Sequence, residues 1–265
     1  MGKLRTATIA AAALVVSAGS GFAADIIEPV IYEPPPEVQV SLGGWYLRGD
    51  IGMANQYLHG GLENSLFSAP DNFQFLDEGD FSAAPTFRGG IGYKLNDWFR
   101  AEGVIEYRGK TDFSALDRYE TVDDADPTTW DGANEYSARK SEWLIMANGY
   151  IDLGTYGGLT PYVGAGIGAS RNTISNFRDI NTATGGVAYG DTNHEWNLAW
   201  ALHAGFGFDI TDRLTLDLGY SYLHLGDASS GDIAPFSGPN TVNNPMVFDS
   251  IISHDVKFGL RYALN

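Results

Sequence analysis

Apolar and polar residues alternate along most of the chain with a period of two, the pattern of strands whose two faces meet different surroundings. The clearest case covers residues 99–110, where the apolar Ile105 and Tyr107 enclose the acidic Glu106. After the N-terminal leader, no window holds the roughly 18–20 apolar residues of a membrane-spanning helix. The alternation predicts eight strands, at residues 45–53, 85–94, 99–110, 142–153, 159–170, 196–210, 214–225 and 254–264.

The connections between these strands alternate in length. Residues 96–97, 154–158 and 211–213 form short turns, whereas 55–80, 114–138, 172–193 and 226–249 form long, unstructured connections. Such loops are uncommon in compact soluble domains but typical of the external side of outer-membrane barrels. An even strand number also lets the last strand pair with the first, so that no backbone edge faces hydrocarbon. We therefore predict an all-β protein, an eight-stranded antiparallel up-and-down transmembrane β-barrel over residues 41–265.

An exported β-sandwich would show the same alternation, so the period alone does not distinguish the two folds. The barrel is favoured because the apolar faces carry almost no charge across about ten residues, the length of a tilted membrane crossing. Aromatic residues also gather near strand ends, as interfacial girdles do: Tyr93, Trp98, Phe99, Tyr107, Trp143, Trp196, Tyr222 and Tyr262. The residues expected to face lipid are Leu47, Ile51, Phe87, Ile91, Ile105, Ile145, Val163, Ile167, Leu202, Phe206, Leu218, Phe258 and Leu260.

The N-terminus has the organisation of a secretory signal peptide. Lys3 and Arg5 precede an apolar run at residues 7–16, and small residues follow. We predict cleavage after Ala23, so that residues 1–23 are removed. Residues 24–40 are rich in proline and predict an extended periplasmic tail.

Composition narrows the functional classes. The 265 residues include no cysteine, which excludes disulfides and thiolate metal sites. The formal net charge is −17, which argues against binding of nucleic acid, since that needs a basic surface. With 33 glycines and 13% aromatic residues, the chain is an acidic β protein rich in both.

Three segments resemble the small outer-membrane β-barrels of Gram-negative bacteria, the family of OmpA-like transmembrane barrels and opacity-type porin-family surface antigens. They are residues 44–52 (GWYLRGDIG), 160–166 (TPYVGAG) and 254–262 (HDVKFGLRY). The resemblance covers residues 45–265, is nearest to the alphaproteobacterial branch, and implies architecture and an outer-membrane location rather than chemistry. Such chains usually end on an aromatic residue that the barrel-assembly machinery reads. This chain ends Ala263-Leu264-Asn265, with Tyr262 as the nearest aromatic residue.

The polar faces of the predicted strands carry many charges. Eight strands enclose a space just wide enough for side chains, so we expect these charges to pair inside the barrel. The inward glycines Gly52, Gly90, Gly92, Gly164, Gly166, Gly168, Gly205 and Gly207 are expected to leave some volume for a small conductance. The predicted ionic residues are Arg48, Asp50, Arg88, Arg100, Glu102, Glu106, Arg108, Glu142, Asp152, Asp209, Asp217, Asp255, Lys257 and Arg261.

Other candidate chemistry is weak. Residues 164–169 match the dinucleotide pattern Gly-x-Gly-x-x-Gly/Ala, but no helix follows to receive a pyrophosphate. Some eight-stranded outer-membrane proteins hydrolyse lipid A with a His, a Ser and an acid on adjacent strands. The candidates here are His203, Ser221, His224, His254 and Asp255. Ser221 and His224 have opposite parity on their strand, so they do not share a face. The long connections are acidic but lack EF-hand spacing. We predict no enzymatic activity, no cofactor and no metal site.

The sequence therefore predicts an integral outer-membrane protein with a structural and surface role, in envelope integrity and external contacts through acidic loops. The alternative is a narrow, low-conductance porin. A lipid A-modifying enzyme and a haem-binding surface protein are less favoured. Expected partners are outer-membrane lipid and lipopolysaccharide, the barrel-assembly machinery during insertion, and host or neighbouring-cell surface ligands.

Overall fold

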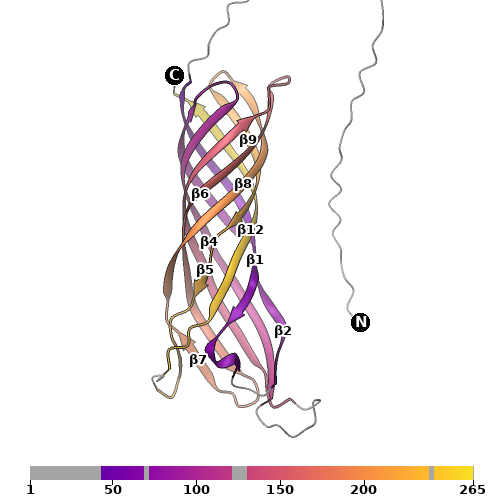
Figure 1. Ribbon diagram of the computed structural model, residues 1–265, viewed down its shortest axis with the longest axis vertical. Coiled ribbons are helices and arrows are strands. Elements are labelled where there is room, and N and C mark those ends of the chain that lie inside the picture. The colour runs from indigo at the N-terminus through magenta and orange to yellow at the C-terminus, as the bar shows by residue number, and fades with distance from the viewer. Residues whose placement is uncertain (1–42, 69–71, 121–129, 239–241, 265) are drawn as a thin grey trace, which may run out of the picture. The chain divides into compact units, whose positions relative to one another are not determined.

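Eight long strands close into a ring in the computed structural model, which describes residues 43–68, 72–120, 130–238 and 242–264. Each strand pairs antiparallel with its neighbour, and the last pairs with the first, which confirms the predicted fold class (Figure 1). The predicted leader and Pro-rich tail lie outside the described residues. The ring consists of β1 (Trp45–Glu63), β3 (Ala84–Lys94), β4 (Phe99–Glu120), β5 (Asn134–Asp152), β6 (Leu159–Asn181), β8 (Asn193–Thr211), β9 (Leu214–His224) and β12 (Val247–Ala263).

Four short strands and one turn of helix lie at one end of this ring. β2 (Asn72–Phe81) pairs with β4, and β7 (Val187–Gly190) joins β6 to β11 (Ile233–Pro235). β10 (Ala228–Ser229) pairs with β12, and a 3₁₀ turn, η1, covers Ser65–Ser68. Within the described part of the chain, no helix has the length and apolar character needed to cross a membrane.

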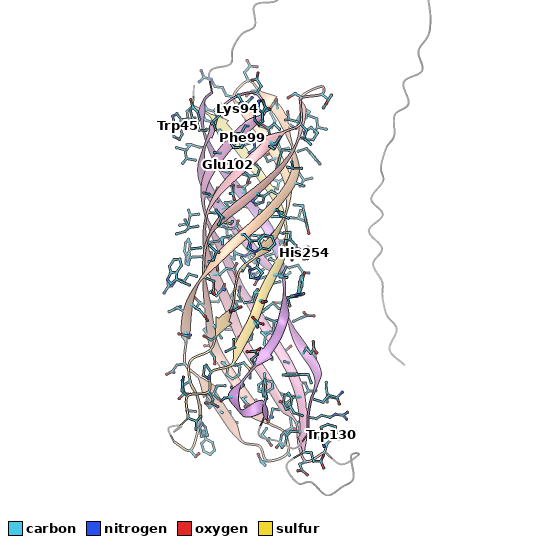
Figure 2. The ribbon with its side chains drawn as sticks, in the orientation of Figure 1. Trp45, Lys94, Phe99, Glu102, Trp130 and His254 are labelled. Atoms are coloured by element: carbon cyan, nitrogen blue, oxygen red, sulfur yellow. The ribbon has the colours of Figure 1, made fainter. Side chains whose placement is uncertain are left out.

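A continuous apolar band covers the outer wall of the barrel, in the half that contains the short turns and the C-terminus of the chain. Every residue predicted to face lipid is exposed there; Ile51 is 60% exposed and Ile167 is 58% exposed. Exposed apolar surface on this scale is unfavourable in water, so the band marks the part of the barrel that faces hydrocarbon. Aromatic residues border it at two levels: Trp45 and Phe99 lie near the short turns, and His254 lies further along the barrel (Figure 2).

The prediction of long unstructured connections is wrong for most of their length. β1, β4, β5, β6 and β12 continue beyond the second aromatic level, and β2, β7, β10 and β11 add to them. We call this part of the molecule the extension (the lower part of Figure 1). Since short turns of outer-membrane barrels face the periplasm, the extension projects from the outer surface.

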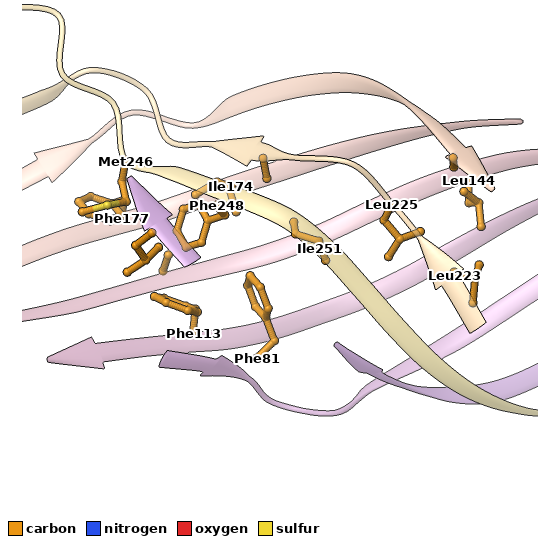
Figure 3. Packing of buried hydrophobic residues seen from close by; sticks show 14 of the residues in the cluster. Phe81, Phe113, Leu144, Ile174, Phe177, Leu223, Leu225, Met246, Phe248 and Ile251 are labelled. Carbon is orange, nitrogen blue, oxygen red and sulfur yellow. The ribbon is translucent and has the colours of Figure 1, made fainter. Parts of the chain in front are cut away.

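An apolar core holds the extension together. In the extension apolar side chains face inward and polar side chains, such as Ser114 and Arg139, face outward, which is the reverse of the arrangement in the membrane part. The rings of Phe81 and Phe113 lie 5.1 Å apart, and those of Phe113 and Phe248 lie 4.9 Å apart (Figure 3). This part therefore has a core like that of a soluble β protein.

A β-bulge produces this reversal in β4. The register of β4 against β5 shifts between Arg108 and Thr111. A bulge adds one residue to one strand, so the residues beyond it switch faces. In β4 the inward positions are even-numbered up to Arg108 and odd-numbered from Thr111, which places Phe113 inside.

We predict that Ile105→Arg lowers the free energy of unfolding in lipid vesicles by about 2–4 kcal/mol, because it places a cation in hydrocarbon at mid-depth. Ser114→Arg, on the same strand but in the extension, is the control and should change stability little. Equal unfolding curves for the two variants in a denaturant titration would contradict the assignment of Ile105 to the lipid face.

We predict that Phe248→Ala loosens the extension and leaves the membrane part folded. Removing a fully buried phenylalanine costs about 3–5 kcal/mol, and Phe248 has no exposed surface. Limited proteolysis should cut the extension faster, while the heat-shifted gel mobility of the barrel persists. Phe236→Ala is the control, since Phe236 is 79% exposed. Unchanged cleavage in Phe248→Ala would mean that the extension does not depend on this core.

Candidate functional site

Charged side chains fill the interior of the membrane-spanning part. They point inward because alternate residues of each strand face the lumen. Within the described residues, seven basic and seven acidic side chains form ion pairs there, so their formal charges cancel. We call this set the ionic network: Arg48, Asp50, Arg88, Arg100, Glu102, Glu106, Arg108, Lys140, Glu142, Asp152, Asp217, Asp255, Lys257 and Arg261.

One half of the network lies near the periplasmic end and centres on Glu102. This carboxylate accepts hydrogen bonds from Arg48 at 2.5 Å, from Arg100 at 2.7 Å and from the hydroxyl of Tyr46 at 2.7 Å. Arg100 also donates to Asp152 at 3.1 Å. Its guanidinium carbon lies 4.1 Å from the centre of a tyrosine ring, that of Tyr150. Such contacts satisfy a cation that has lost its water.

The other half centres on Arg108, which has no exposed surface. Its guanidinium binds both oxygens of Asp255, at 2.6 and 2.9 Å, and one oxygen of Glu106 at 2.9 Å. Its Nε lies 2.5 Å from Glu142, which also pairs with Lys140. The residues come from β4, β5 and β12, so the contacts tie strands together across the lumen as well as along the wall.

Arg88 joins the two halves. Its Nε lies 3.3 Å from Asp50 and 3.4 Å from Glu106. Lys257 adds a second cation beside Glu106, at 2.9 Å. The ion pairs thus run unbroken from Asp152 to Lys140. Among the described residues, Arg261 and Asp217 pair only with each other, 2.5 Å apart.

Asp209 is the one predicted ionic residue that the structure places outside the network. It has the expected parity on β8 but lies at the periplasmic rim, where it is exposed and accepts a hydrogen bond from Thr215 at 2.7 Å. The lumen is open to water at that point, so no ion pair is required. Conversely, Lys140 belongs to the network but was not predicted, although it shares the face of Glu142 two residues away. The predicted strand began at Glu142, which is too late to include it.

The expectation that inward glycines leave free volume is wrong. A β-carbon at these positions would collide with a neighbouring side chain or, as at Gly90 and Gly168, with the backbone of the neighbouring strand. The crowding also accounts for the glycine pattern at 164–168, because small residues there make room for β5 side chains. Such glycines and the side chains that cover them are Gly92 with Tyr46, Gly164 with Tyr150, Gly205 with Tyr162 and Gly207 with Arg261.

A cavity lies at each end of the lumen. A vestibule of about 650 Å³ opens at the periplasmic end beside Arg100 and Arg261. A cavity of about 380 Å³ lies in the extension beside Tyr136. Between them, an enclosed cavity beside Lys257 and His203 measures about 10 Å³, about the space of a single water.

The structure brings one Ser–His pair of the hydrolase candidates together. His203 Nδ1 lies 2.8 Å from the hydroxyl of Ser221, and its Nε2 lies 3.2 Å from the side-chain oxygen of Asn148. A neutral imidazole that donates to Asn148 therefore accepts the serine proton, as in a nucleophile–base pair. The adjoining cavity of about 10 Å³ admits no lipid substrate, so the contacts link three strands of the inner wall.

The remaining hydrolase candidates are divided between the two faces. His224 stacks on Trp200 and His254 stacks on Tyr57, both on the outer wall, whereas Asp255 belongs to the ionic network. Among the side chains that the structure describes, no group of three or more His, Cys, Asp or Glu residues is arranged to hold a metal ion.

The model of the outer membrane protein beta-barrel domain family matches residues 8–262. The chain belongs to this outer-membrane β-barrel family. The predicted resemblance and outer-membrane location are thereby confirmed. A Brucella suis protein is 32% identical over 279 residues, 94% of each chain. A Rickettsia bellii protein named as a candidate adhesin is 28% identical over 224 residues, 83% of this chain and 88% of that protein. Among solved structures, Neisserial surface protein A has a TM-score of 0.43 at 17% identity, covering 83% of this chain and 96% of that chain.

We predict that Arg108→Met lowers the free energy of unfolding of the barrel by about 3–5 kcal/mol, because it leaves buried carboxylates without their partner. Arg139→Met is the control. Arg139 pairs with Asp112 at 3.0 Å on the exposed surface, where an ion pair contributes about 0–1 kcal/mol. Urea unfolding in vesicles measures both, and equal losses would contradict a central role for Arg108.

Proposed function

We propose that this outer-membrane barrel is a structural, non-enzymatic surface protein that supports envelope integrity and presents its extension to external contacts. The observation that carries the proposal is that paired charges occupy the lumen of the membrane part, where the cavity beside Lys257 and His203 measures about 10 Å³. A wide pore needs about sixteen strands. The eight strands of this ring provide a rigid anchor for the extension instead.

The extension supports the second half of the proposal. It is built from paired strands with an apolar core, so it holds its outward polar side chains in fixed positions. The Rickettsia bellii relative carries the name of an adhesin, in line with external contacts for this chain. We propose host or neighbouring-cell surface molecules as the ligands of the extension.

Lipid partners follow from the outer wall. We propose that the apolar band contacts outer-membrane lipid and that outward basic residues near the aromatic border contact lipopolysaccharide phosphates. The position of Arg171 supports this proposal, since it lies opposite Trp143 on β5 and opposite Trp196 on β8. The barrel-assembly machinery is the proposed partner during insertion.

A narrow porin is the second candidate. Open space on both sides of the ionic network favours it, because a pore would join the vestibule to the outer cavity through a rearrangement of the ion pairs between them. Glu102 is the side chain to test, since it bridges Arg48 and Arg100.

Single-channel recording in planar bilayers distinguishes the two functions. We expect refolded protein, verified by heat-shifted gel mobility, to show no discrete steps, because the lumen is filled. Glu102→Gln should open small steps or lower stability, whereas Glu135→Gln, an outward carboxylate of the extension, should leave the recording unchanged. Reproducible steps in the unaltered protein that change in Arg100→Ala would overturn the structural proposal in favour of the pore.

A further inference from the structure

The cavity of about 380 Å³ in the extension has aromatic walls. The rings of Phe67 and Phe73 stack 4.6 Å apart, and the ring of Tyr136 lies 6.3 Å from that of Phe67. Its volume lies in the range of small-molecule sites, which are mostly apolar with a few polar groups. We call it the mouth cavity; it is lined by Asn64, Phe67, Phe73, Tyr119, Asn134, Tyr136, Asp179, Ala188, Ile233, Pro235, Asn244 and Met246.

A backbone irregularity turns Asp179 into this cavity. β6 changes register against β5 between its pairs at Ser137 and Arg139, and Asn176 there has a φ of 54°. Asparagine tolerates this left-handed conformation better than most residues. Beyond it the inward positions change parity, so that Phe177 and Asp179 face inward. The alternation of the sequence alone would have placed Asp179 on the outer surface.

The mouth cavity carries negative charge without compensation. Asp117 lies fully buried beside it and accepts hydrogen bonds from the backbone N–H of Asn134 at 2.9 Å and the hydroxyl of Tyr136 at 2.5 Å. Among the described residues, neither Asp117 nor Asp179 has an ion-pair partner, and no hydrogen bond reaches the Asp179 carboxylate. In the membrane part, by contrast, every buried charge of the ionic network is paired.

The Asp179 carboxyl responds to this environment. Burial, and then the negative charge of Asp117, raise its pKa to about 6. The other titratable groups that face it are the phenols of Tyr119 and Tyr136, on β4 and β5. A positive charge placed beside Asp179 would relieve the repulsion between the two carboxylates.

We propose that the mouth cavity binds a small organic cation, an ammonium group attached to an aromatic or branched apolar body. Aromatic faces attract a cation while they cover its apolar part, and a carboxylate without a partner supplies the opposite charge. Both features occur here within one cavity at the outer end of the barrel. The site is independent of the proposed structural role, and it gives the extension a specific small-molecule ligand.

The test uses full-length refolded protein in detergent micelles and benzyltrimethylammonium as the probe, followed by isothermal titration calorimetry. We expect saturable binding, and much weaker binding of the neutral benzyl alcohol. Affinity should rise by up to about tenfold from pH 5 to pH 7, since about one tenth of a carboxyl with a pKa of about 6 is ionised at pH 5. Asp179→Asn should remove this pH dependence and lower the affinity about tenfold at pH 7.

Glu135→Gln is the matched control, because it removes an outward carboxylate from the neighbouring strand and should bind as the unaltered protein does. Phe67→Ala tests the aromatic wall without a change of charge and should also weaken binding. Heat-shifted mobility establishes that each variant is folded, and if Asp179→Asn fails this check, Phe67→Ala and the pH profile decide. Equal affinity for the probe and benzyl alcohol, a flat pH profile, or unchanged binding in both cavity variants would overturn the proposal.

Discussion

Closure of the ring between β12 and β1 is the constraint on which the rest of the structure depends. A strand in hydrocarbon has no water to satisfy its N–H and C=O groups, so every edge must find a partner strand. Strands β1 and β12 satisfy each other's backbone groups through sixteen pairs of facing residues, from Tyr46 with Ala263 to Glu63 with Val247. Once eight strands close, the diameter of the lumen is fixed, and whatever faces inward must fit there and satisfy its own charges.

The ionic network is the solution to this second requirement. Seven cations and seven carboxylates neutralise one another, and tyrosines add further contacts, as Tyr46 does for Glu102 and Tyr150 for Arg100. Glycines on the inward face make room for these large side chains. The lumen is thus closely packed although it is polar, which ties the strand register to pairwise charge contacts rather than to an apolar core.

The inward and outward faces of the strands exchange their polar and apolar character where the barrel leaves the membrane. Water then covers the outer wall, so burial of apolar residues inside becomes favourable, and the bulges in β4 and β6 turn those two strands accordingly. The same change leaves Asp179 in the mouth cavity, and Asp117 beside it, without the cations that accompany carboxylates in the membrane part. One barrel therefore contains an interior of balanced charges in the membrane part and an acidic, aromatic cavity in the extension.

The sequence by itself determined the eight strands, the inward and outward faces within the membrane and nearly all residues of the ionic network, because a period of two is a local property of the chain. It did not determine the extension, since one extra residue at a bulge reverses the faces without altering composition. Asp209 and Lys140 show the same limit: whether a charge meets water or a partner depends on where its strand ends in the ring. Likewise, only the tertiary structure showed that the space beside inward glycines is filled and that Ser221 meets His203, because both depend on side chains from strands distant in sequence.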